Sequence, residues 1–95
     1  MTEATPLTAE TVLKRPPTTR VRKFRGRLLL ANTSTAFELD EIGQFIIARI
    51  DGKKPISALG EALAAEFDVS ADEATADAAE LLSVLVENQL VTVVG

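Results

Sequence analysis

The spacing of hydrophobic residues in the second half of the chain predicts three consecutive helices. The first should begin after Asp40, whose carboxylate can accept hydrogen bonds from the free amides of a first helical turn. It should end at Gly52, because a left-handed backbone costs glycine little. Its expected buried stripe has three- and four-residue spacing and consists of Ile42, Phe45, Ile46 and Ile50. A tight Asp51-Gly52 turn would then lead into the next helix.

The second and third predicted helices follow with little chain between them. The second should begin near Pro55, since proline is tolerated at the first helical position, and should end at residues 68–69. Its expected stripe is Ile56, Leu59, Leu63 and Phe67. Ser70 and Glu73 match the S-x-x-E capping box, which marks the start of the third helix. The apolar stripe predicted there is Ala74, Ala78, Leu81 and Leu85, widened by Leu82.

Upstream of the helices the pattern changes to the two-residue alternation of strands. The pair Pro16-Pro17 excludes a helix interior, so we expect strands only after Pro17. Three strands, at 20–24, 27–31 and 35–39, would form an antiparallel meander. Residues 90–94 could be either a short closing strand or an exposed tail. The predicted fold is α+β and winged helix-turn-helix-like, a three-stranded antiparallel sheet followed by three helices, with residues 1–12 as a flexible segment and 13–95 as one domain.

Composition limits the chemistry available to the chain. Its 95 residues contain no His, Cys, Tyr or Trp, so nucleophilic triads, thiolate chemistry and imidazole acid-base catalysis are excluded. No glycine-rich phosphate loop or metal-ligand spacing accompanies the carboxylates. We therefore expect a protein that is not an enzyme and that uses no cofactor or metal. The sequence also contains no apolar run long enough for a membrane span and no export signal, which predicts a cytoplasmic protein without membrane association.

The net charge of −4 hides a strong asymmetry between the two parts of the chain. Residues 1–34 carry seven basic and two acidic side chains, whereas residues 35–95 carry three basic and twelve acidic ones. The predicted third helix has no Lys or Arg, which disfavours its insertion between DNA phosphates. We thus expect no nucleic-acid partner. A winged-helix DNA-binding regulator stays open as an alternative, because the basic strands could touch a phosphate backbone.

The order of several short segments resembles the PqqD-like family, whose members are RiPP recognition elements, the peptide chaperones of ribosomally made and post-translationally modified peptides. The resemblance covers about residues 13–93, and it rests on the order and spacing of the segments because no single one is specific. The matching segments are Arg15-Pro16-Pro17, Phe37-Glu38-Leu39-Asp40, Ile50-Asp51-Gly52, Ile56-Ser57-Ala58-Leu59, Asp77, and Leu85 with Leu90-Val91.

This resemblance implies a binding function. In the family, the leader segment of a precursor peptide adds as a strand beside the third strand, packs against the third helix, and is presented to a modifying enzyme. That enzyme could be a radical SAM enzyme, a cyclase or a leader protease. The resemblance places the edge strand at Thr35, Ala36, Phe37, Glu38 and Leu39. Helical spacing then selects the facing wall, which we predict to be Asp77, Glu80, Leu81 and Val84.

Each of these assignments has a simpler alternative. Phe37 and Leu39 could fill the core instead of a groove, and Asp77 and Glu80 could be an ordinary solvated face. An exposed strand edge invites self-pairing as well as peptide addition, so the chain could be a monomer or a weak homodimer. An adaptor or dimerisation module without a peptide ligand therefore also remains open.

Overall fold

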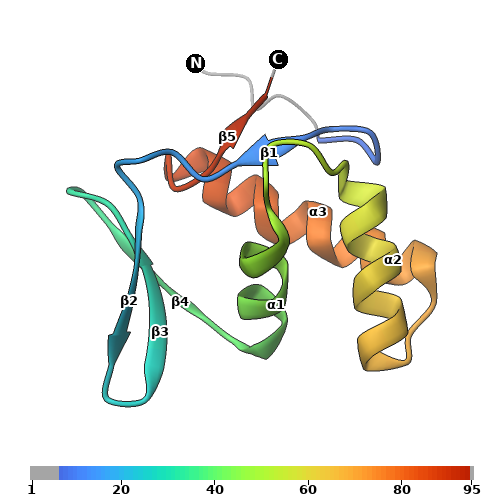
Figure 1. Ribbon diagram of the computed structural model, residues 1–95, viewed down its shortest axis with the longest axis horizontal. Helices are drawn as coiled ribbons and strands as arrows, with labels where there is room; N and C mark the ends of the chain where they lie inside the picture. Colours follow the sequence, from blue (N-terminus) through green and yellow to red (C-terminus); the bar gives the residue numbers. More distant parts are fainter. Residues whose placement is uncertain (1–6, 95) are drawn as a thin grey trace.

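One antiparallel sheet and three helices make up the body of the protein. The structure is a computed structural model that describes residues 7–94. In chain order its elements are β1 (Leu13–Lys14), β2 (Arg20–Phe24), β3 (Arg27–Ala31), β4 (Ala36–Leu39), α1 (Glu41–Arg49), α2 (Ile56–Phe67), α3 (Ala71–Glu87) and β5 (Thr92–Val93) (Figure 1). The predicted α+β arrangement, with a three-stranded meander before three helices, is confirmed.

The main sheet has the order β2-β3-β4, and both of its connections are tight turns. Arg25 and Gly26 join β2 to β3 with φ angles of 53° and 79°, the left-handed backbone that two-residue hairpins require. Between β3 and β4, the Asn32 N–H donates to the Thr35 carbonyl at 3.0 Å. Thr35 consequently belongs to this turn, and the predicted third strand was one residue too long.

A second, two-stranded sheet joins the two ends of the described chain. Strand β1 pairs with β5 in antiparallel register, with Leu13 opposite Val93. The prediction that strands begin only after Pro17 was wrong, because β1 finds its partner near the other end of the sequence. Of the two possibilities for residues 90–94, the structure contains the closing strand.

The segment before β1 is tied to the start of α2. The carbonyls of Ala9 and Thr11 accept hydrogen bonds from the Ser57 and Ile56 N–H groups, at 2.8 and 2.9 Å. These bonds satisfy amides that the first turn of a helix leaves unpaired, and Pro55 at the cap position makes no side-chain bond of its own. Of the segment 1–12 that was expected to be flexible, residues 1–6 lie outside the described part of the chain.

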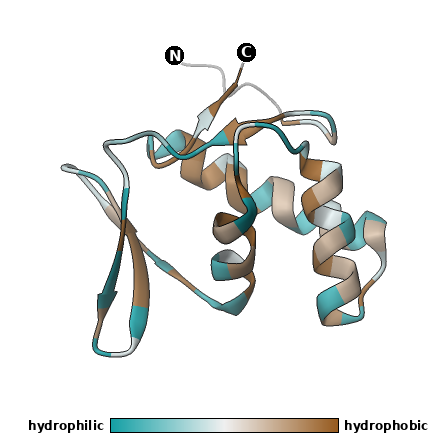
Figure 2. Cartoon of the chain, in the orientation of Figure 1, coloured by the Kyte–Doolittle hydropathy of each residue, from teal (hydrophilic) through white to brown (hydrophobic). Residues whose placement is uncertain are grey.

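The helices pack on one face of the sheet around a small continuous core. In Figure 2 hydrophobic colour runs along β3 and the inner faces of the helices, whereas β2 is mainly hydrophilic. The fully buried large side chains are Leu13, Leu30, Ile46, Ile56, Leu59, Leu63, Leu82, Leu85, Leu90 and Val91. Within residues 7–94, no helix is long and apolar enough to cross a membrane.

The predicted stripe of α1 is rotated relative to the observed one, whereas the predicted stripe of α3 is confirmed except at Leu81. In α1 the buried residues are Gly43, Ile46 and Ile47, whereas Ile42 is 37% exposed. In α3 Leu82 is buried and Leu81 is only partly covered. Glycine at position 43 lets the Leu39 side chain lie against the helix backbone, since a Cβ there would come within 3.1 Å of Leu39 Cδ2. This contact turns that face of α1 towards the core.

The predicted helix starts are confirmed, and one helix end differs from the prediction. Asp40 Oδ1 accepts from the Gly43 N–H at 2.8 Å, and Ser70 Oγ accepts from the Glu73 N–H at 3.1 Å. Helix α1 ends at Arg49, because Ile50 already has an extended backbone with ψ of 119°. Gly52, with φ of 78°, lies beyond the helix, and its N–H donates to the Leu13 carbonyl at 3.1 Å.

Candidate functional site

A hollow of about 370 Å³ lies between the start of α1 and the solvent side of α3. Aliphatic and acidic side chains line it. The residues that line it are Asp40, Ile42, Asp77, Glu80, Leu81 and Val84. All four α3 residues that helical spacing predicted therefore line one hollow. They lie on a more exposed side of α3 that flanks the buried side formed by Ala78 and Leu82.

Strand β4, which leads directly into this hollow, is an edge strand. In the described chain its only strand partner is β3. The Asn32 to Thr35 bond fixes the alternation of the antiparallel ladder, so the main-chain groups of Phe37 and Leu39 face β3. By the same alternation, the N–H and C=O groups of Ala36 and Glu38 face the open edge.

The side chains of β4 divide in the same alternating way. Leu39 is only 3% exposed, and Phe37 is partly buried against the core, so both help to hold the strand in place. Ala36 and Glu38 are exposed, and the Glu38 carboxylate forms an ion pair with Arg27 at 3.2 Å. The alternative that Phe37 and Leu39 belong to the core therefore holds for their side chains. Thr35, also predicted for this site, lies in the turn that precedes the strand.

Asn32 fixes the position of β4 relative to α3. Its Nδ2 donates to the carbonyls of Asn88 and Gln89 at 3.3 and 3.4 Å, just beyond the end of α3. Its Oδ1 accepts from the N–H groups of Ser34 and Thr35, both at 2.8 Å. One side chain thus joins the β3–β4 turn to the end of the helix that lines the hollow. Sequence reasoning recognised Asn32 only as a turn residue, because its helix partners lie more than fifty residues away.

Asp40 and Ile42 are the lining residues that the sequence analysis did not predict for the site. Asp40 was recognised as the cap of α1, and its carboxylate serves as that cap while also bordering the hollow. Ile42 was placed in the core. The signal that could have corrected this is Gly43, since a small residue inside a helical stripe often marks a close contact with another element.

The chemistry of the hollow suits binding. Three carboxylates, those of Asp40, Asp77 and Glu80, line it together with the aliphatic side chains, and no Lys or Arg is among the lining residues. Among residues 7–94, no cluster of His, Cys, Asp or Glu is arranged to hold a metal ion. The site combines an open backbone edge, apolar side chains and negative charge. These are the features that hold an extended peptide with apolar and basic side chains.

Comparison with known proteins places the chain in a family. The sequence model of the family described as Coenzyme PQQ synthesis protein D (PqqD) matches residues 25–91. A "PqqA binding protein" of Xanthomonas oryzae pv. oryzae is 34% identical over 68 residues, which cover 72% of this chain and 74% of the relative. The protein of the same name from Xanthomonas campestris pv. campestris is 33% identical over the same shares of the two chains.

Two solved structures share the fold. The solution structure of the PqqD part of Methylobacterium extorquens PqqCD, described as a stand-alone RiPP recognition element, superposes with a TM-score of 0.82 at 22% identity, covering 96% of this chain and 99% of that one. TbiB1 in complex with the TbiA(beta) leader peptide gives a TM-score of 0.70 at 22% identity, covering 82% and 93%. As the sequence resemblance predicted, the chain belongs to the PqqD family and has the fold of a RiPP recognition element.

Proposed function

We propose that this protein binds the leader segment of a ribosomally synthesised precursor peptide along β4 and α3. The observation that carries the proposal is the open edge of β4 beside the hollow on α3. The names of its relatives support it, since these are called PqqA binding proteins, and one protein of the same fold is described in complex with a leader peptide.

The leader adds to the sheet as a fourth strand. The N–H and C=O groups of Ala36 and Glu38 provide the backbone hydrogen bonds, which give affinity without regard to sequence. An apolar leader side chain then rests on Ile42, Leu81 and Val84 in the hollow, and this contact sets the register. Asn32 links the turn before β4 to the end of α3, which favours a site that is formed before the peptide binds.

The protein itself performs no chemistry in this proposal. It holds the leader in the cytoplasm while the attached core peptide remains free for a modifying enzyme such as a radical SAM enzyme, a cyclase or a leader protease. A strand on an open edge leaves both of its ends outside the binding protein, so the core peptide can extend into another active site.

Amide chemical shifts measured during a titration test the proposal directly. We expect the leader encoded beside this protein to shift the amides of residues 33–39 and those along the exposed side of α3. The β1–β5 pair serves as an internal control, because it joins the two ends of the described chain and takes no part in the proposed site. If a saturating concentration of leader shifts neither the amides of residues 33–39 nor those of α3, this site is ruled out.

A further inference from the structure

The β2–β3 hairpin has an outer face that no helix covers. Leu30 in β3 is fully buried against the helices, so the residues that alternate with it point to the other side of the sheet. The hairpin projects away from the helices in Figure 1. All five residues of β2 are exposed. The ladder register places on this outer face Arg20, Arg22, Phe24, Arg27, Leu29 and Ala31.

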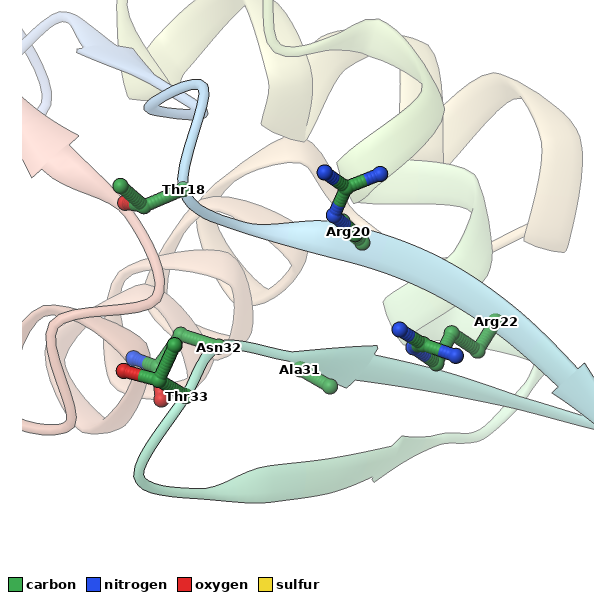
Figure 3. A pocket seen from close by; sticks show the side chains of 6 residues that line it. All are labelled: Thr18, Arg20, Arg22, Ala31, Asn32 and Thr33. Carbon is green, nitrogen blue, oxygen red and sulfur yellow. The ribbon is translucent and has the colours of Figure 1, made fainter.

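A small pocket opens on this outer face. It has a volume of about 150 Å³ and is lined by Thr18, Arg20, Arg22, Ala31, Asn32 and Thr33 (Figure 3). Both arginines lie on the same strand two residues apart, so their side chains point to the same side of the sheet. A pocket of this size accommodates a carboxylate, and guanidinium groups bind carboxylates through paired, charge-assisted hydrogen bonds.

The hairpin carries a positive charge that no acidic residue of its own offsets. Residues 20–31, which form the hairpin, contain five Lys and Arg side chains and no Asp or Glu. Within the described chain the hairpin's one ion pair is the exposed contact between Arg27 and Glu38. Arg20 and Arg22 are therefore available to a partner with negative charge.

Apolar groups accompany these cations. Phe24 is 60% exposed at the end of β2, and the Arg25 guanidinium carbon lies 5.2 Å from the centre of its ring. Leu29 is partly exposed between the arginines of the outer face. Arginine together with an exposed aromatic ring is the composition that recurs at the energetic centres of protein interfaces.

We propose that the outer face of the β2–β3 hairpin docks an acidic surface of a partner protein, with a carboxylate of that partner in the pocket lined by Arg20 and Arg22. Naming the partner as the modifying enzyme rests on the proposed leader-binding function. A protein fits better than nucleic acid because Phe24 and Leu29 supply apolar contacts beside the arginines, as in the cores of protein interfaces. Strands β2 and β4 are opposite edges of the sheet, so a partner on the β2 side of the hairpin and a leader on β4 can be held together.

Hexaglutamate is the probe that tests the carboxylate pocket in the full chain. At about 10 mM salt, where the Debye length is about 30 Å, we expect it to shift the amides of Arg20, Arg22 and Asn32. The double variant Arg20→Gln/Arg22→Gln should bind it about tenfold more weakly, since two charge-assisted contacts are lost. The matched control is Lys53→Gln/Lys54→Gln, which removes the same charge from the α1–α2 connection and should weaken binding much less, through long-range charge alone. An equal loss in both double variants, or no shift in the hairpin, would overturn the proposal.

Two further titrations separate the possible partners. A duplex DNA of about 12 base pairs that bound more tightly than hexaglutamate through the same amides would make this a phosphate surface and overturn the protein-docking proposal. The leader should bind wild type and the arginine double variant equally. If the leader fails to bind while hexaglutamate binds as described, the leader site is wrong and the basic docking surface stands.

Discussion

The two edges of the β2-β3-β4 sheet differ in burial, in charge and in what lies beside them. At the β4 edge, Leu39 is almost fully buried and the hollow next to it is bordered by three carboxylates. At the β2 edge every residue is exposed, and the pocket beside it contains two arginines. The β4 edge is acidic and is held in place by a buried side chain. The β2 edge is basic, projects from the molecule and contributes no buried side chain to the core. In the two proposals made above, this difference would let one small domain bind two partners of opposite charge.

The largest difference between the edges should appear in stability. Leu39→Ala removes a buried side chain from β4 and should lower the free energy of unfolding by about 2–5 kcal/mol. Val21→Ala in β2 should cost less than about 1 kcal/mol, because that side chain is 41% exposed. Urea denaturation of both variants measures this. Equal losses would show that β2 is part of the core and would remove the distinction between the edges.

Gly60 in α2 allows close packing against α3, the helix that lines the hollow beside β4. At Gly60 an added Cβ would come within 2.7 Å of Thr75 Cα, so Gly60→Ala must push α3 away from α2. We expect a loss of about 1–3 kcal/mol from overpacking, despite the better helix propensity of alanine, together with weaker leader binding. Thermal denaturation and a leader titration check this, with the exposed neighbour substitution Glu61→Ala as control. A stabilised Gly60→Ala protein would contradict the close helix contact.

Charge reversal on each edge in turn should separate their functions. Glu80→Lys should weaken the binding of a leader with basic residues by about fivefold at low salt, since an attractive pair becomes repulsive. Arg22→Glu makes the opposite reversal on the other edge and should leave leader affinity unchanged. Calorimetric titrations of both variants at two salt concentrations give the comparison. If Arg22→Glu has the larger effect, the leader uses the basic edge.

The smallest effect concerns Asp51, in the connection between α1 and α2 and remote from both edges. The N–H groups of Lys54 and Lys53 donate to its Oδ1 at 3.0 and 2.9 Å and hold the pKa of Asp51 below its ordinary value of 3.8. A lowered folded-state pKa means that its stabilising contribution is present above that ordinary value and is lost as the pH falls through the folded-state pKa.

The urea midpoint at neutral pH and below the ordinary pKa of Asp51 measures this contribution. The wild type should lose more stability on acidification than Asp51→Asn, whose amide oxygen can still accept from both N–H groups but does not titrate across this range. The difference between the two proteins isolates this carboxylate from the other acidic groups. Identical pH dependence in both would show that the Asp51 turn contributes nothing through its charge.

Local signals in the sequence were sufficient to predict most elements. The alternation in 20–24 and 27–31 and the caps at Asp40 and Ser70 depend on near neighbours, and the structure confirms these strands and helix starts. The family resemblance pointed to the third helix, and helical spacing then selected the α3 residues that are now found along the hollow. In contrast, β1 was missed because its partner lies about eighty residues away, and a two-residue strand has no periodicity of its own.

The site residues that the sequence analysis did not predict were missed for the same reason. Ile42 was assigned to the core because it follows the helical period, and only the contact between Gly43 and Leu39 shows which face of α1 is inside. The role of Asn32 depends on carbonyls at the far end of α3. Spacing identifies residues on one face of one element. The pairing of two faces comes from packing between elements, which periodicity does not contain.

Proline substitution at each edge tests most directly whether β4 receives the leader. Glu38 N–H faces the open edge, so Glu38→Pro removes a donor to the leader without breaking a bond to β3. Lys23→Pro makes the matched change on the free edge of β2, and Glu38→Ala accounts for the lost carboxylate. We predict that Glu38→Pro lowers leader affinity by about tenfold relative to Glu38→Ala, while Lys23→Pro leaves it unchanged. Unchanged affinity in Glu38→Pro, or a comparable loss in Lys23→Pro, would contradict strand addition at β4.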